Sequence, residues 1–240
     1  MDTSVAQHDA AAVAAAVARL PRMPDGTLLP PPAIKLVLFD MDQTILRCHT
    51  RGCYRGNVAD LCPKVSMDFV HLVPGLLDAG YHVGIVTFSD ALMALSTDDP
   101  TVSVKAGEPL VHELLELTFA KHAEAAMPVL EAQARAKHLV SRIHVAAAFP
   151  QLQNQQVAFA NKPMPRSKQW HIEKIKAKLF SFGVSVANQD ILLFDDTVPN
   201  VRQAEQMRVH AFVVDKSTAF TADIWNSAMA VVASRLLSSS

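Results

Sequence analysis

Long apolar runs, abundant cysteine and a large net charge are all missing from this 240-residue sequence. No hydrophobic stretch approaches the roughly 18–20 residues that a membrane-spanning helix needs, so we expect no membrane association. The formal net charge is −1, from 22 Lys and Arg against 23 Asp and Glu, which leaves no global field to recruit nucleic acid. We therefore expect no nucleic-acid partner, and any site for an anion must be local.

Only three cysteines occur, namely Cys48, Cys53 and Cys62. An odd number in one stretch is not the framework of a secreted, disulfide-stapled domain, and it favours a reducing compartment. With His49 the cysteines make a poor zinc site, because no CxxC pair is present. The alanine-rich segment from Val5 to Arg19 lacks the basic start and leucine-rich core of a signal peptide, and we interpret it as a helix. We predict free thiols and a cytoplasmic location.

Proline marks the first division of the chain. Five prolines and an Asp25-Gly26 pair lie between Pro21 and Pro32, which predicts an extended linker with turns. We divide the chain there into residues 1–33, a helix with its linker, and a catalytic domain over residues 34–240. Half of all residues are hydrophobic, so one domain of this length can bury a full core.

Short apolar runs alternate with segments of helical periodicity along residues 34–240. The runs predict strands at Ile34–Phe39, Tyr81–Val86, Ile143–Phe149, Ile191–Phe194 and His210–Val214. Helices are predicted at Met67–Ala79, Pro109–His122, Val129–Val140, Lys168–Phe182, Val198–Met207 and Thr221–Leu237. This order predicts an α/β fold with a Rossmann-like parallel sheet and helices on both faces. The stretch from Asp90 to Lys162 exceeds one crossover, so we place a small helical insertion within about residues 91–142.

Polar side chains gather where the predicted strands end. Asp40 and Asp42 follow the first strand, Thr87 the second, and Asp195 and Asp196 the fourth. Ligands of open parallel sheets bind beyond the carboxyl ends of the strands, so we expect these groups around one crevice. Several carboxylates together need a cation, and oxygen ligands without Cys or His suit Mg²⁺. A metal facing an aspartate and a lysine is suited to phosphoryl transfer.

These residues also resemble the motifs of a known family. Phe39-Asp40-Met41-Asp42-Gln43-Thr44 is similar to the DxDxT signature of phosphatases of the haloacid dehalogenase (HAD) superfamily. Thr87, Lys168 and Asp195-Asp196 resemble the second, third and fourth motifs in order and spacing, and the likeness covers roughly residues 34–214. The DD pair with Asn200 is similar to small magnesium-dependent phosphatases. The resemblance implies a HAD-like fold and a Mg²⁺-dependent phosphomonoester hydrolase.

The resemblance implies a role for each matching residue. Asp40 would be the nucleophile that becomes an aspartyl-phosphate, and Asp42 the general acid and base. Thr87 and Lys168 would bind the phosphoryl group. The expected metal site comprises Asp40, Asp42 through its backbone carbonyl, Asp195 and Asp196, with Asp196 the direct ligand and Asp195 in the outer shell. Expected contacts with substrate come from Thr44, Arg51, Arg55 and Asn200.

Several alternatives stay open at this stage. Ser89 is the rival of Thr87, and Lys162 the rival of Lys168, while His171 receives no role. A phosphorylated receiver is disfavoured, because receivers place the acidic pair at the first strand. Phosphotransferase or phosphomutase activity, or a catalytically idle binding protein on the same fold, remain alternatives. We expect no large cap domain, so the phosphorylated substrate is a small molecule or a protein.

Overall fold

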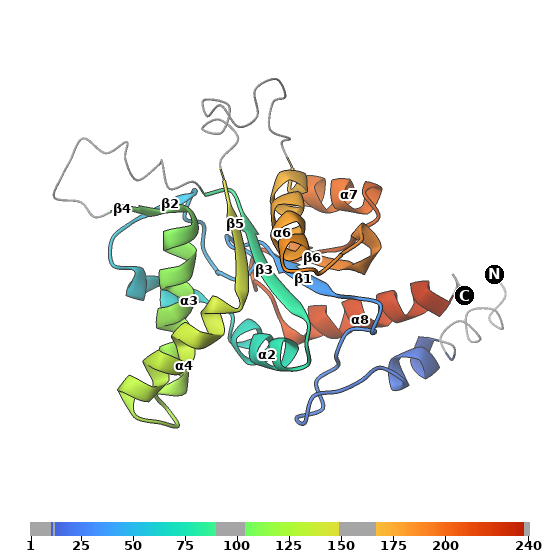
Figure 1. Ribbon diagram of the computed structural model, residues 1–240, viewed down its shortest axis with the longest axis horizontal. Coiled ribbons are helices and arrows are strands. Elements are labelled where there is room, and N and C mark those ends of the chain that lie inside the picture. Colours follow the sequence, from blue (N-terminus) through green and yellow to red (C-terminus); the bar gives the residue numbers. More distant parts are fainter. Residues whose placement is uncertain (1–10, 12, 90–103, 149–166, 238–240) are drawn as a thin grey trace, which may run out of the picture.

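Five parallel strands form the centre of the protein, seen in a computed structural model that describes residues 11, 13–89, 104–148 and 167–237 (Figure 1). The strands are β1 (Leu36–Phe39), β3 (His82–Thr87), β5 (Ile143–Ala147), β6 (Ile191–Asp195) and β7 (His210–Val213). Their order in the sheet is β5-β3-β1-β6-β7, and every neighbouring pair is parallel. The predicted α/β fold with a parallel sheet is confirmed.

Helices cover both faces of this sheet. Their bounds are α2 (Met67–Asp78), α3 (Gly107–Ala123), α4 (Val129–Ser141), α6 (Gln169–Ser181), α7 (Val198–Gln206) and α8 (Ala222–Leu237). The buried side chains of α2, α3 and α8 belong to one hydrophobic cluster, and those of α6 and α7 belong to a second. Figure 1 shows α6 and α7 on the opposite side of the sheet from α2 and α8. Within the described residues, no helix has the length and apolar character to cross a membrane.

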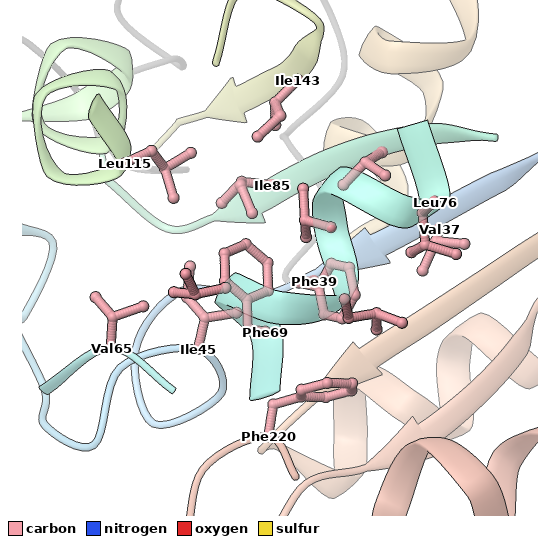
Figure 2. Close-up of a cluster of buried hydrophobic side chains, with 14 of the residues drawn as sticks. Val37, Phe39, Ile45, Val65, Phe69, Leu76, Ile85, Leu115, Ile143 and Phe220 are labelled. Carbon is pink, nitrogen blue, oxygen red and sulfur yellow. The ribbon is translucent and has the colours of Figure 1, made fainter. Parts of the chain in front are cut away.

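The first strand contributes to both cores, because successive side chains of a strand point to opposite faces. Val37 and Phe39 enter the larger cluster, while Leu36 and Leu38 enter the smaller one. In Figure 2, Phe39 lies among aromatic side chains of other elements. Its ring centroid is 5.1 Å from that of Phe69 and 5.2 Å from that of Phe220, both edge-on. Burial on both faces explains why this strand is an almost continuous apolar run.

The order of the strands creates a crevice beside β1. The chain moves outward from β1 to β3 and β5, and then returns to β6, which pairs with the other side of β1. The connections after β1 and β6 therefore leave the sheet in opposite directions. Such a switch point is where open α/β sheets bind ligands.

A second, two-stranded sheet was not predicted. β2 (Cys53–Arg55) pairs antiparallel with β4 (Val104–Ala106), and the 3-10 helix η1 (Val58–Lys64) follows β2. Strands of three residues are too short to show alternation in a sequence. The pairing joins the segment after β1 to the start of α3.

The predicted insertion is partly a layer of the main core. Most of the stretch from Asp90 to Lys162 that the structure describes is α3, α4 and β5. α3 links β3 to β5 and buries Leu110, Leu114 and Phe119 in the larger cluster, as a crossover helix does. α4 packs against α3 and adds Ala136 and Val140 to the same cluster. Residues 90–103 and 149–166 lie outside the described residues.

The predicted linker is packed on the domain instead of separating two parts of the chain. Met23, Leu28 and Leu29 are buried in the larger cluster. The indole nitrogen of Trp225 donates to the carbonyl of Leu28 at 2.8 Å, and the hydroxyl of Tyr81 donates to Pro30 at 2.5 Å. Apolar residues lie between the prolines, and their burial holds this segment against the domain.

Candidate active site

Three carboxylates meet at the switch point of the sheet. Asp40 directly follows β1, Asp195 ends β6, and Asp196 comes next; all are buried. One oxygen of each lies within 4.8 Å of the others. The backbone holds this arrangement, because the amide of Asp40 donates to the carbonyl of Phe194 at 2.9 Å. Adjacent parallel strands thus bring together residues that are 155 positions apart in sequence.

A buried lysine joins two of these carboxylates. Lys168 comes just before α6, and its side chain is 1% exposed. Its Nζ donates to Asp40 Oδ1 at 2.7 Å and to the carbonyl of Val86 at 2.8 Å, and lies 3.7 Å from Asp195 Oδ2. A charge so far from solvent is held only by such partners. Lys162, the rival in the sequence, lies outside the described residues.

Burial disturbs the protonation of the cluster. It raises the pKa of Asp40 to about 7, and the neighbouring Asp195 adds to this, although Lys168 acts in the other direction. Burial also raises the pKa of Asp195, against the opposing effects of Lys168 and of its hydrogen bonds with Thr197 and Asn200. Burial makes the charged form of these carboxylates costly, and a cation bound beside them would offset that cost. The cluster contains only oxygen donors, which fits a hard divalent ion.

The two adjacent aspartates have different surroundings. Asp195 accepts from the backbone amide of Thr197 at 2.8 Å, and its two carboxylate oxygens both accept from Asn200 Nδ2, at 3.0 and 3.1 Å. Within the described part of the chain, the carboxylate of Asp196 accepts only a long bond, 3.3 Å, from the hydroxyl of Thr197, and it pairs with Lys216 at 3.1 Å. The oxygens of Asp195 are thus committed to the protein, whereas those of Asp196 are more available to a ligand.

Two residues expected to contact substrate form hydrogen bonds with the two adjacent aspartates. Thr44 is fully buried, and its hydroxyl accepts from the amide of Asp196 at 3.0 Å. Asn200 is buried in the first turn of α7 and donates to Asp195. Both lie behind the carboxylates in this structure, and their predicted contact with substrate stays a prediction. Thr87 is the buried last residue of β3, next to the carbonyl that Lys168 binds.

Asp42 lies under a flap, which we define as residues 47–55. Its carboxylate accepts from the amide and hydroxyl of Thr50, at 2.9 and 2.8 Å, and from the amide of Arg51 at 3.2 Å. The ring of His49 also contacts it through Nδ1. The carboxylate of Asp42 is not part of the three-carboxylate cluster, and a metal contact through its backbone carbonyl stays a prediction. The side chains of Arg51 and Arg55 are exposed, and their predicted contact with substrate stays a prediction.

Ser89 fixes the flap to the rest of the domain. Its fully buried hydroxyl donates to the carbonyl of Gly52 at 2.5 Å and accepts from the amide of Gly107 at 2.6 Å. Ser89, the rival of Thr87, thus links the flap to the first residue of α3. The sequence offered a signal for it only as a hydroxyl two residues beyond the strand.

His49, Thr50 and Lys216 were not assigned to the site from sequence. His49 and Thr50 contact Asp42 because the flap turns back over it. Lys216 follows β7, so the rule of polar residues after strand ends would have found it if applied to the last strand. His171 is buried, its Nδ1 has no hydrogen-bond partner among the residues that the structure describes, and burial next to Lys168 lowers its pKa to about 3.

The three cysteines are free, as predicted. Among the described residues, the three aspartates are the only group of at least three His, Cys, Asp or Glu side chains close enough to share a metal ion. The structure therefore offers no support for a cysteine-based zinc site within that part of the chain.

Comparisons with known proteins find likenesses in three-dimensional structure alone. No family model and no curated protein matches the sequence. A D,D-heptose 1,7-bisphosphate phosphatase from Burkholderia thailandensis is 13% identical, with a TM-score of 0.35, over 85% of this chain and 99% of its own. A protein from Mesorhizobium loti described as a HAD-like phosphatase is 13% identical, with a TM-score of 0.43, over 90% and 93% of the two chains.

A third solved structure, from Cytophaga hutchinsonii, is described as a sugar phosphatase of the HAD superfamily. It is 12% identical, with a TM-score of 0.33, over 87% of this chain and 93% of its own. At such identities and TM-scores, these likenesses carry no conclusion about activity.

Proposed function

We propose that this chain is a phosphatase of the HAD superfamily, a Mg²⁺-dependent phosphomonoester hydrolase that works through an aspartyl-phosphate on Asp40. Asp40 carries the proposal, because it is a buried carboxylate at the switch point of the sheet, paired with Lys168 at 2.7 Å and grouped with Asp195 and Asp196. A carboxylate nucleophile, a fixed cation and a set of metal-ligand oxygens are the parts that phosphoryl transfer requires.

The residues present fit a hard divalent cation. Asp40, Asp196 and the backbone carbonyl of Asp42 would hold it, while Asp195 would orient them from behind. When bound, the cation neutralises the carboxylates and the developing charge on the phosphoryl oxygens. A cytoplasmic enzyme would have Mg²⁺ available as this cation, and free thiols agree with that compartment.

Asp40 and Lys168 would perform the first half of the reaction. An oxygen of Asp40 attacks phosphorus, the bond between phosphorus and the ester oxygen breaks, and an acyl phosphate forms on Asp40. Lys168 is already aligned by Asp40 and the carbonyl of Val86, so its ammonium needs no reorganisation to neutralise a phosphoryl oxygen. Thr87, at the end of the neighbouring strand, would donate to a second oxygen.

Asp42 would move the protons. It protonates the leaving alkoxide in the first half, and in the second it takes a proton from the water that attacks phosphorus and releases Asp40 and inorganic phosphate. Thr50, Arg51 and His49 hold the carboxylate of Asp42 in one orientation, which limits the geometry in which it can act. This positioning accounts for its separation from the metal-ligand cluster.

The direct test is hydrolysis of an aryl phosphate by the purified protein with Mg²⁺ or with EDTA. We expect turnover only with the metal, none with Asp40→Asn, and a phosphorylated peptide containing Asp40 after rapid acid quench. Turnover that survives EDTA, or that persists in Asp40→Asn, would refute the proposal. A phosphoryl group found on a residue other than Asp40 would assign the nucleophile to that residue.

The metal assignment has a separate test that does not need activity. A ligand that binds only the native state raises the melting temperature. We expect the Mg²⁺-induced shift to shrink markedly in Asp196→Asn and less in Asp195→Asn, because only Asp195 is committed to Thr197 and Asn200. The opposite ranking would exchange the two ligands.

The molecule that accepts the phosphoryl group distinguishes a hydrolase from a phosphotransferase. Adding glycerol to the assay would yield glycerol phosphate at the expense of inorganic phosphate if the chain were a phosphotransferase. An idle binding protein would show the Mg²⁺ shift without any turnover. Hydrolysis leads among these functions, because the carboxylate of Asp42, two residues after the nucleophile, is fixed by Thr50 and would activate water.

A further inference from the structure

Lys216 lies at the mouth of the site on a turn that is fixed at both ends. The amide of Val214 donates to the backbone carbonyl of Asp195 at 3.0 Å before the turn, and the amide of Phe220 donates to the backbone carbonyl of Thr44 at 2.7 Å after it. Within the turn, Asp215 Oδ1 accepts from the amide and hydroxyl of Ser217, at 2.8 and 2.7 Å. The turn that carries Lys216 is thus held by the end of β6 and by the segment that follows β1, the two places from which the carboxylates of the cluster come.

The side chain of Lys216 is the outer cation of the site. Its Nζ is 3.1 Å from Asp196 Oδ2, and the side chain is 55% exposed, against 7% for Asp196. Lys168 is its inner counterpart, 1% exposed and directed at Asp40 and Asp195. Among the described residues, no lysine or arginine other than these two forms an ion pair with the three carboxylates.

A cation bound by Asp196 and the ammonium of Lys216 need the same carboxylate. Lys168 has other partners and no route to solvent, whereas the long, exposed side chain of Lys216 can turn away while its turn stays in place. Released beside a crevice that has just gained two positive charges, its ammonium is available to an incoming phosphate dianion. The mouth of the site then carries an attractive charge that the buried lysine does not supply.

We propose that Lys216 is a substrate-binding residue that leaves Asp196 when a divalent cation binds there and then pairs with the anionic substrate. The proposal rests on the phosphatase function argued above and adds a residue outside the matched motifs. It implies opposite effects of one side chain, since Lys216 competes with the metal and assists the anion.

The test compares Lys216→Met with wild type in three measurements. These are the apparent Kd of Mg²⁺ from thermal shifts, the apparent Kd of inorganic phosphate from thermal shifts in saturating Mg²⁺, and the KM of an aryl phosphate. We expect Mg²⁺ to bind about two- to fivefold tighter, and phosphate and substrate to bind weaker by a similar factor, with a smaller change in kcat. Lys216→Arg should keep most of the anion affinity.

Lys35→Met is the matched control. Lys35 pairs with Asp190 at 3.0 Å and is 49% exposed, but it precedes β1 and lies at the other end of the sheet. It should change none of the three quantities. Unchanged Mg²⁺ and phosphate affinities in Lys216→Met, or equal changes in Lys35→Met, would overturn the proposal. An inactive wild type would instead overturn the phosphatase function, and the two binding measurements would still decide the role of Lys216.

Discussion

Replacing Asp40 with asparagine should stabilise the metal-free protein at neutral pH while abolishing activity. Burial opposes the charge of Asp40 more than Lys168 favours it, so its pKa is raised from 3.8 to about 7. Asparagine has nearly the same shape and cannot ionise. The variant removes a buried charge and keeps an oxygen that can accept from Lys168.

The size and sign of the effect follow from proton binding. Between roughly pH 4 and pH 7 the folded protein keeps a proton on Asp40 that the unfolded chain has released, so the free energy of unfolding falls as pH rises. A shift of about three pKa units at about 1.4 kcal/mol each gives a loss of about 4 kcal/mol by pH 7–8. This is an upper figure, because Asp195, whose pKa is also raised, takes part of the cost of burying charge in the cluster. The loss should be missing from Asp40→Asn.

Urea denaturation in EDTA, at a series of pH values from about 4 to about 8, measures this difference directly. We expect the gap between variant and wild type to open with rising pH; contributions from buried histidines cancel in the difference. Asp215→Asn is a control of opposite sign, because Ser217 lowers the pKa of the exposed Asp215, whose contribution is lost as pH falls. A gap for Asp40→Asn that stays constant with pH would refute the reasoning.

Three further changes test other parts of the structure. Lys168→Met should lower the free energy of unfolding by about 3–5 kcal/mol and abolish turnover, since it leaves buried carboxylates unpaired, whereas Lys174→Met, in an exposed pair, should cost less than about 1 kcal/mol in urea denaturation. Ser89→Ala should lower the free energy of unfolding by about 1–3 kcal/mol and speed amide hydrogen exchange in the flap; exchange as slow as in wild type would contradict the proposed link between Ser89 and the flap. Gly84→Val should cost at least about 1–3 kcal/mol in thermal denaturation, because a Cβ there would lie 2.9 Å from Ile175 Cδ1; an unchanged midpoint would contradict that close packing.

Local patterns in the sequence were enough for the sheet and for the centre of the site. A strand buried on both faces has to be apolar throughout, so the runs Ile34–Phe39 and Ile191–Phe194 could be recognised as strands; the structure has them at Leu36–Phe39 and Ile191–Asp195. The polar residue that follows such a strand stands out for the same reason. Because parallel strands end at one edge, Asp40, Asp195 and Asp196 could be expected to meet.

Only the tertiary structure decided what surrounds these groups. The partners of Asp42, the clamp made by Ser89 and the ion pair of Lys216 each join segments that carry no shared pattern. Short irregular segments such as the flap are placed by contacts with distant residues, and single hydrogen bonds leave no periodicity in a sequence. The same holds for Thr44 and Asn200, whose residue types suited a contact with substrate, but whose burial directs them to Asp196 and Asp195.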